Sequence, residues 1–453
     1  MSSNTKLRAI PAVEKLLHAL GELDIPRPAV VALVRREVAA LRKEKEIPSF
    51  EEVLGRARAA IDRLRAQRIK PVLNGTGVVI HTNLGRSPLA PAVIDTLQAI
   101  GANYNNLEYD LIAGERGGRA GYLEHNLALL CGSEAATVAN NCAAALVLAL
   151  RYFTSGDRKE VIISRGELVQ IGGGFRIPEV LEASGCTLRE VGATNKTSVA
   201  DYRKAIGKNS ALILKVHRSN FFMGGFIESP STEELAELAK QKRLPFIEDL
   251  GSGAVVDTDE IAGAEHEPTP AETIKRGVDL VTFSGDKLFG GPQAGIIAGK
   301  AKLIAAMKRE PFFRALRCDK LILSALQTTV DLYLRGTPDD AGLILGLLRQ
   351  SPNQLRVRAE TILKTLDGLP AKISVGKGKA QVGGGTLPKS VIDSVTLDIL
   401  PRNFSLGDFA ARLRTASIPV VGYIGGDRFK IDLRTILPRQ DEDLARVLRE
   451  ALA

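Results

Sequence analysis

The stretch VDLVTFSGDKLFGGPQAGIIAGK, residues 278–300, joins two apolar segments through a turn that contains one lysine. Lys287 follows the first predicted strand, and Gly290 and Gly291 come soon after it. Lysines are mostly exposed and stand among polar neighbours, whereas this one is enclosed by apolar and small residues. The pattern raises the question of which chemistry needs a lysine at the end of a buried strand.

Short apolar segments alternate with helical stretches from about residue 71 onward. The segments are AATVANN, KEVIISR, CTLREVG, ALILKVH, LPFIEDL, DLVTFSG and AGIIAGK. This alternation predicts an α/β fold with a mostly parallel, doubly wound sheet and helices on both faces. Ligands of such sheets bind beyond the carboxyl ends of the strands, and polar residues follow several of these segments.

Three domains are predicted along the chain. Residues 1–66 have apolar residues at helical spacing and are expected to form a small helical bundle, with Ser49 as the N-cap of its last helix. Residues 67–335 form the predicted core. Residues 336–453 are expected to form a smaller α/β domain, in which GKGKAQVGGGTLPKS (376–390) is interpreted as a glycine-rich loop.

The net charge of +9 is unevenly distributed. Residues 1–70 hold 15 basic and nine acidic side chains, a net +6, which leaves +3 for the rest of the chain. A basic segment indicates a polyanionic partner, but it is also typical of a solvated helical face. On charge alone the solvated face is the preferred interpretation.

Cysteine and histidine spacing gives no support for a disulfide framework or a metal site. The four cysteines form no CxxC pair, and the five histidines show no HExxH spacing. No apolar run is long enough to span a bilayer, and the N-terminus lacks the apolar centre of a signal peptide. We therefore expect a cytoplasmic protein with no membrane partner.

Lys287 and Asp249 together predict a site for pyridoxal 5′-phosphate (PLP). A deprotonated lysine amine can capture the aldehyde of PLP as a Schiff base. The pyridine nitrogen of PLP needs an acid partner, because its positive charge makes the ring an electron sink. Asp249 ends the segment LPFIEDL, 38 residues before Lys287, and suits that role.

Other polar residues are candidates for holding the remaining groups of PLP. The phosphate needs backbone amides at a helix N-terminus, which VANNCAAALVLALRYF would supply through Asn141, Cys142 and Ala143. Ser284 is a candidate to add a hydroxyl to the phosphate, and Asn220 to donate to the phenolic oxygen. Each residue alone also has a structural interpretation as a cap, a turn or a packing residue. Their order along the chain, however, resembles that of the aspartate-aminotransferase-like PLP enzymes, called fold type I.

Longer motifs strengthen and narrow this resemblance. VLNGTGVVIHTNLGRSPLA, LEYDL, ISRGELVQIGGGFRIPEV, LKVHRSN, EDLGSG and FSGDKLFGGPQAGIIAGK together resemble the bacterial L-seryl-tRNA(Sec) selenium transferases, or selenocysteine synthases. The likeness covers nearly the whole chain. In that family the lysine of SGDKLxGGPQAG carries PLP, and the helical N-terminal domain grips the tRNA. The resemblance implies these roles for Lys287 and for residues 1–66.

The resemblance implies conversion of L-seryl-tRNA(Sec) to L-selenocysteinyl-tRNA(Sec). The seryl amine would displace Lys287 from PLP, and the freed amine would take the Cα proton. Loss of the seryl hydroxyl as water would give aminoacrylyl-tRNA, to which selenophosphate delivers selenium. The implied partners are serine-charged tRNA(Sec), selenophosphate and further copies of the chain in a homodecamer, a pentamer of dimers, with no DNA partner.

Several arginines match functional positions of the family. Arg86, Arg314 and Arg317 match the arginines that line its selenophosphate pocket, and the guanidinium fork suits a tetrahedral oxyanion. Arg314 and Arg317 would share one face of a helix, while Arg86 is a candidate for a neighbouring subunit's site. A surface salt bridge is the alternative for each. The candidates for tRNA phosphates, equally interpretable as solvent-facing residues, are Arg63, Arg65 and Arg68.

The chain departs from the family pattern at one position and leaves two histidines without a firm role. Family members commonly have NNNAAA where this chain has NNCAAA, so Cys142 replaces an asparagine. Backbone amides would tolerate that change, whereas a side-chain contact to the phosphate would be weakened by it. His217 either stacks near the cofactor ring or packs under the sheet, and His81 lies within a family motif.

Two other functions are compatible with parts of the sequence. A related PLP lyase that acts on a small amino acid or amino sugar would share the fold, but it would not need a basic helical tRNA domain. A tRNA-binding or assembly protein without catalysis would not need Asp249, Ser284 and Lys287.

Overall fold

The computed structural model describes residues 10–44, 46–170, 174, 176–336 and 343–453, and it divides the chain into two compact units. The units are Met1–Pro71 and Val72–Ala453. Part of the predicted motif ISRGELVQIGGGFRIPEV lies outside the described residues. Within the described part of the chain, no helix combines the length and the apolar character that a bilayer crossing requires.

The described residues of the first unit form three helices with a core of their own. They are α2 (Val13–Leu20), α3 (Arg27–Leu41) and α4 (Phe50–Ala66). Leu16, Val34 and Ile61 are buried where the helices pack together. The predicted N-cap is confirmed, because Ser49 Oγ accepts from the Glu52 amide at 3.3 Å and Glu52 Oε2 accepts from the Ser49 amide at 2.8 Å.

The seven apolar segments predicted to be strands all belong to one sheet. They form β5 (Ala135–Ala139), β6 (Glu160–Ser164), β7 (Thr187–Val191), β8 (Ser210–Val216), β9 (Phe246–Gly251), β10 (Leu280–Ser284) and β11 (Gly295–Gly299). Their order is β5-β11-β10-β9-β8-β6-β7, and β11 alone in this sheet runs antiparallel to its neighbours. The predicted mostly parallel sheet is confirmed.

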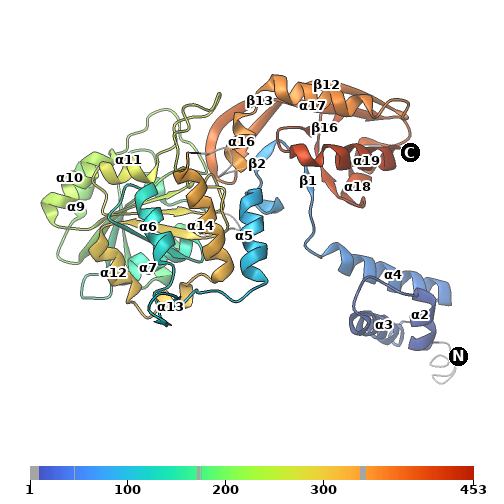
Figure 1. The fold of residues 1–453 in the computed structure, drawn as a ribbon, viewed down its shortest axis with the longest axis horizontal. Helices are drawn as coiled ribbons and strands as arrows, with labels where there is room; N and C mark the ends of the chain where they lie inside the picture. Colours follow the sequence, from blue (N-terminus) through green and yellow to red (C-terminus); the bar gives the residue numbers. More distant parts are fainter. Residues whose placement is uncertain (1–9, 45, 171–173, 175, 337–342) are drawn as a thin grey trace. The chain divides into compact units, whose positions relative to one another are not determined.

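Helices cover both faces of this sheet (Figure 1). Consecutive strand residues point to opposite faces, so Ile296 and Ile297 of β11 lie in two different cores. One core includes α6 (Gly121–Leu130), α10 (Thr232–Lys242) and α14 (Lys320–Leu334). The other includes α7 (Cys142–Phe153), α8 (Ile177–Ala183) and α12 (Ala301–Lys308). Burial of both faces explains the nearly continuous apolar strands of the sequence.

A second sheet of five strands carries the C-terminal part of the chain. Its order is β15-β16-β13-β12-β2. The strands are β2 (Val78–Ile80), β12 (Ala371–Gly383), β13 (Thr386–Pro401), β15 (Tyr423–Gly425) and β16 (Arg428–Asp432). Three helices share its core: α17 (Pro352–Lys364), α18 (Leu406–Arg414) and α19 (Asp441–Leu452). This part of the chain thus contains both strands and helices, as expected of a smaller α/β unit.

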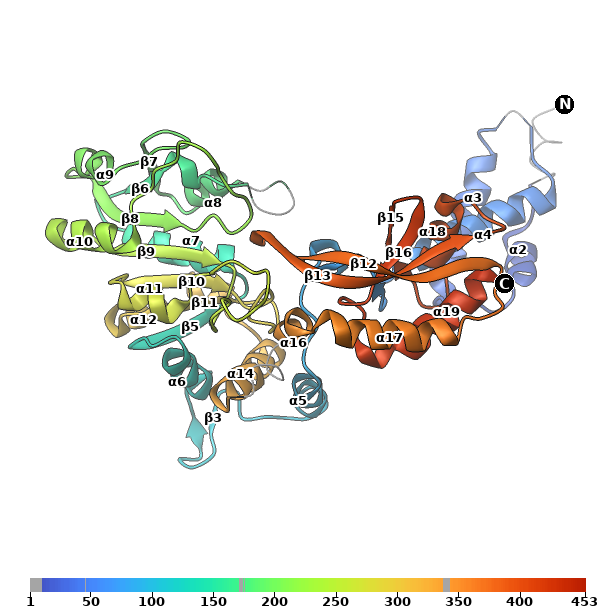
Figure 2. The ribbon, with the colours of Figure 1, turned by 90° about the horizontal axis from the view of Figure 1, so that it is seen from above.

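The predicted glycine-rich loop at 376–390 is wrong, because most of it forms the long hairpin of β12 and β13 (Figure 2). Every second residue from Gly378 to Val382 is buried, which is a strand pattern that the glycines obscured. A Cβ at Gly378 would lie 2.8 Å from Asp432 Oδ2, so glycine here permits close packing within the sheet. The turn itself uses Gly383, Gly384 and Gly385, all with positive φ.

Arg434 joins the C-terminal sheet to a helix that precedes it. This fully buried side chain donates to the carbonyls of Leu347 (2.7 Å) and Leu348 (3.0 Å) in α16 (Leu343–Arg349), and to that of Asp393 (2.6 Å) in β13. A guanidinium has enough donors in a fixed fork to satisfy three carbonyls at once. The contact stabilises the end of α16 against the sheet.

We expect Arg434→Ala to destabilise the protein by about 3–5 kcal/mol, because it leaves two buried carbonyls and one part-buried carbonyl without donors and a cavity beside them. Thermal unfolding followed by circular dichroism measures the change. Arg414→Ala is the matched control, because Arg414 is exposed at the end of α18. Its removal should change the free energy of unfolding by less than about 0.5 kcal/mol. Equal unfolding temperatures for the two variants would contradict this account.

Candidate functional site

Lys287 lies just past the carboxyl end of β10, in a turn that backbone and side-chain contacts fix. Its carbonyl accepts from Ser87 Oγ at 2.6 Å, and the next amide, of Leu288, donates to the Ser252 carbonyl at 3.1 Å. Gly253 has a φ of +75°, and a Cβ there would lie 2.3 Å from the Ser284 carbonyl oxygen. The last glycine of the motif EDLGSG is therefore needed for the close approach of two chain segments.

Asp249 is a buried carboxylate held by two neighbouring elements. The register of β9 and β10 sets it beside Thr282, whose Oγ1 donates to Asp249 Oδ1 at 2.9 Å. Cys142 Sγ, from α7, donates to the same oxygen at 3.4 Å. Burial raises the pKa of Asp249, while the Thr282 and Cys142 hydrogen bonds and the charge of Lys287 oppose that rise.

The N-terminus of α7 presents backbone amides beside this carboxylate. Asn141 is the N-cap, and its Oδ1 accepts from the Ala144 amide at 2.9 Å. The amides of Cys142 and Ala143 are the first two of the helix, so they have no intrahelical carbonyl to bond. Burial and the nearby Asp249 raise the pKa of the Cys142 thiol well above its usual value. The thiol is therefore a neutral donor, and the amides are available to an anion.

The predicted residues line one cavity of about 480 Å³. Asn220 contributes an amide that donates to the Gln170 carbonyl at 2.8 Å, while its buried Oδ1 has no hydrogen-bond partner among the described residues. The cofactor candidates that line the cavity are Lys287, Asp249, Asn141, Cys142, Ala143, Asn220 and Ser284. The cavity thus brings together an amine, a buried carboxylate, helix amides and an unpaired amide oxygen. These groups fit the aldehyde, the ring nitrogen, the phosphate and the phenolic oxygen of PLP.

The two histidines have different surroundings. His217 lines the cavity, its amide donates to the Asp249 carbonyl at 2.8 Å, and its Nε2 lies 3.2 Å from Glu267 Oε1. His81 does not line the cavity, but its carbonyl accepts from the amide of Arg86 at 3.0 Å. His217 is thus at the site with Glu267 close to its ring, while His81 shapes the turn that leads to Arg86.

The three arginines matched to a selenophosphate pocket do not come together in one chain. Arg86, with a φ of +63°, lines the cavity and pairs with Asp286 at 2.7 Å. Arg314 lies in α13 (Phe313–Leu316), and the helix ends before Arg317, which pairs with Glu108 at 3.4 Å. Arg314 and Arg317 therefore do not share a helical face as expected, and neither lines the cavity.

Sequence reasoning missed the residues that support the site from other elements. Thr282 lies inside an apolar strand, and only its register with Asp249 reveals its role. Gly384 and Gly385 of the β12–β13 turn line the cavity, although this segment was interpreted as a loop of another domain. A period-two pattern in residues 378–382 was the signal that could have found the hairpin.

Comparisons with known proteins agree with this geometry. A family model described as L-seryl-tRNA selenium transferase matches residues 72–437. The chain belongs to this family. It is 43% identical over 464 residues to the L-seryl-tRNA(Sec) selenium transferase of Carboxydothermus hydrogenoformans, covering 100% of this chain and 99% of the relative. The corresponding protein of Geobacter sulfurreducens is 44% identical over 456 residues, with coverage of 97% and 98%.

A solved structure of D-glucosaminate-6-phosphate ammonia-lyase shows the same fold. The two structures match with a TM-score of 0.59 and 21% sequence identity over 86% of this chain and 97% of that one. Family membership and this likeness confirm the predicted fold type I architecture and imply PLP as the cofactor. The chain is thus an enzyme of the L-seryl-tRNA selenium transferase family.

The buried state of Asp249 predicts how PLP binding responds to acid. The carboxylate form suits a protonated pyridine nitrogen, and it is lost as pH falls through a pKa that burial has raised. Thr282→Val removes a hydrogen bond that stabilises the carboxylate, and so raises the pKa of Asp249 further. The pH midpoint of acid-induced PLP release should therefore shift upward.

Visible absorbance of PLP-loaded protein, titrated from neutral to acidic pH, measures that midpoint. Thr273→Val is the control, because Thr273 is equally buried but bonds only the Thr269 carbonyl. A midpoint for Thr282→Val that stays at the value of the unaltered protein, or moves downward, would refute the role given to this hydroxyl.

Proposed function

We propose that this protein converts L-seryl-tRNA(Sec) to L-selenocysteinyl-tRNA(Sec) with selenophosphate as the selenium donor, and that Lys287 is its catalytic residue. The observation that carries the proposal is the shared cavity of Lys287, Asp249 and the first amides of α7 in a chain of this family. The cavity joins an amine that can act as a base to groups that can hold a phosphorylated aromatic aldehyde.

Each residue of the cavity has a physical role in this proposal. Bound PLP supplies an electron sink for the negative charge that develops at the serine Cα. Asp249 stabilises the positive ring nitrogen, and the amides of Cys142 and Ala143, with the Ser284 hydroxyl, hold the phosphate. Lys287 would anchor the cofactor through its amine, and the same amine, when free, would take the proton from the serine Cα.

Selenophosphate is a compact anion and needs cations near the reacting carbon. Arg86 supplies one in the cavity, where its ion pair with Asp286 fixes the guanidinium. Arg314 and Arg317 lie outside the cavity of their own chain, so we propose that they contribute to selenophosphate binding across a subunit interface. An assembly of ten copies, a pentamer of dimers, would provide such interfaces. Sedimentation velocity measures the mass of the assembly and so tests this number of copies.

The proposed partner of residues 1–66 is the tRNA, and the proposed location is the cytoplasm. The main rival is a PLP lyase that acts on a small amino acid or amino sugar, since the similar solved structure is that of an ammonia-lyase. Identity above 40% over nearly the whole of the selenium transferases, including their N-terminal part, favours the tRNA substrate.

Single-turnover conversion of seryl-tRNA(Sec) with selenophosphate tests the proposed activity. We expect Lys287→Ala to lower the rate by at least about 10²–10⁴-fold, because it removes both the cofactor anchor and the base. Lys302→Ala is the control, since this lysine is exposed on α12 and should leave the rate unchanged. If the unaltered, PLP-loaded protein forms no product, the small-substrate lyase becomes the better assignment.

The ion pairs of the N-terminal arginines lead to a prediction about tRNA binding. Arg65 and Arg68 pair with Asp62 and Asp24, whereas Arg63 is exposed and has no ion-pair partner among the described residues. Arg63→Ala should therefore weaken tRNA(Sec) binding more than Arg65→Ala and reduce the salt slope by about 0.7–0.9. Filter binding at several salt concentrations compares the variants, and equal affinities would contradict a phosphate contact at Arg63.

A further inference from the structure

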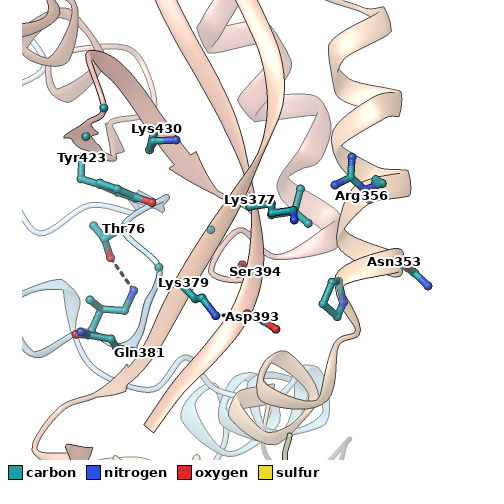
Figure 3. Close-up of a pocket in the computed structure, with 17 residues that line it drawn as sticks. Thr76, Asn353, Arg356, Lys377, Lys379, Gln381, Asp393, Ser394, Tyr423 and Lys430 are labelled. Carbon is teal, nitrogen blue, oxygen red and sulfur yellow. Dashed lines mark hydrogen bonds and ion pairs between the residues drawn. The ribbon is translucent and has the colours of Figure 1, made fainter. Parts of the chain in front are cut away.

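A larger cavity lies in the C-terminal sheet and shares no lining residue with the cavity at Lys287 (Figure 3). Its volume is about 1040 Å³, roughly twice that of the cofactor cavity. It opens along β12, whose outer edge pairs with β2 only at Gln381 and Gly383, in the part of the chain that the structure describes. The proposed reaction uses none of these residues.

Basic side chains dominate the walls of this cavity. Four cations line it, Arg356, Lys377, Lys379 and Lys430, against the single carboxylate of Asp393. Lys379 pairs with Asp393, and Lys430 pairs with Asp398 at 2.5 Å. Among the described residues, the side chains of Arg356 and Lys377 form no ion pair or hydrogen bond, although the charge of Lys377 acts on the Asp393 carboxylate that Lys379 pairs with.

Arg356 and Lys377 point toward one another across the space between α17 and β12 (Figure 3). Like charges that face each other repel, and an anion between them removes the repulsion. Asn353 lies one turn before Arg356, on the first turn of α17, where the helix dipole also favours negative charge. The space between the two cations therefore fits an anion.

The rest of the cavity fits a polymer with repeated charges better than one small anion. Lys377 lies opposite Val395 and Lys430 opposite Asp398, so the register places the two lysines on different faces of the sheet. Gly426, in the turn between β15 and β16, is exposed, and the Tyr423 ring lines the same side as Lys430. Cations on both faces of the sheet, with an aromatic ring beside Lys430, match a nucleic-acid backbone and a base.

We propose that this cavity binds RNA, with a backbone phosphate held between Arg356 and Lys377. The inference rests on the proposed function, because the seryl-tRNA substrate is the RNA that this chain must hold. It assigns part of the tRNA affinity to the C-terminal sheet in addition to the basic helical unit. Contacts of this kind are to phosphate and position the RNA without reading its sequence.

The test compares the full-length, PLP-loaded protein with the double variant Arg356→Ala/Lys377→Ala. The dissociation constant for seryl-tRNA(Sec) is measured by filter binding between about 50 and 200 mM salt. We expect the double variant to bind about tenfold more weakly at low salt, with a salt slope lower by about 1–2, because two charge contacts are lost. The variant Arg356→Lys/Lys377→Arg should restore most of the affinity, since charge rather than fork geometry is needed.

Lys372→Ala is the matched control. Lys372 is an exposed lysine of the same strand that does not line the cavity, so its removal should leave affinity and slope unchanged. If the double variant behaves like this control, Lys377 serves only to protect the open edge of β12, Arg356 makes no contact with RNA, and the proposal is overturned. Unfolding temperatures within about 2 °C of the unaltered protein show that binding is compared between folded proteins.

Conversion at saturating protein separates this inference from the proposed function. The double variant should convert bound seryl-tRNA(Sec) at the normal single-turnover rate, because its residues do not touch the cofactor cavity. Absence of product from the unaltered protein would defeat the proposed function instead. Calorimetric titration with inorganic phosphate tests whether the cavity binds free phosphate instead of an RNA phosphate. Phosphate binding that disappears in the double variant while its tRNA affinity stays normal would overturn the RNA assignment.

Discussion

The buried carboxylate of Asp249 is the constraint on which the cofactor site depends. Removing a carboxylate from water costs several kcal/mol unless hydrogen bonds replace the lost hydration. Thr282 from β10 and Cys142 from α7 supply those bonds, so the cost is offset only when β9, β10 and α7 keep their register. Lys287 follows the end of β10 after two residues, and the same register therefore places its amine near the carboxylate and the amides of α7.

The sequence predicted most of this arrangement because the relevant signals are local. The seven strands of the main sheet were found from short apolar runs, and the site residues from the polar positions that follow them. The carboxyl ends of parallel strands share one edge, so Asn141, Asp249 and Lys287 had to lie close together once the sheet was correct. Ser49 was found in the same way, from a capping pattern that spans only four residues.

Features that depend on pairing between distant segments were not predictable in this way. The β12–β13 hairpin contains glycines that suggest a loop, yet Gly376 and Gly378 make room for the side chains of Asp398 and Asp432. The end of α13 before Arg317 is set by the packing of that segment against the turn at Asn140, whose amide donates to the Leu316 carbonyl. The cation pair of Arg356 and Lys377 likewise exists only when α17 lies beside β12.

The central claim is that Lys287 anchors PLP in the cavity that Asp249 and α7 define. Borohydride reduction of the PLP-loaded protein, followed by proteolysis and mass spectrometry, tests this claim most directly. The account predicts a phosphopyridoxyl group on the peptide that contains Lys287 and on no other lysine peptide at comparable yield. A label on a different lysine, or none on a protein that has taken up PLP, would contradict it.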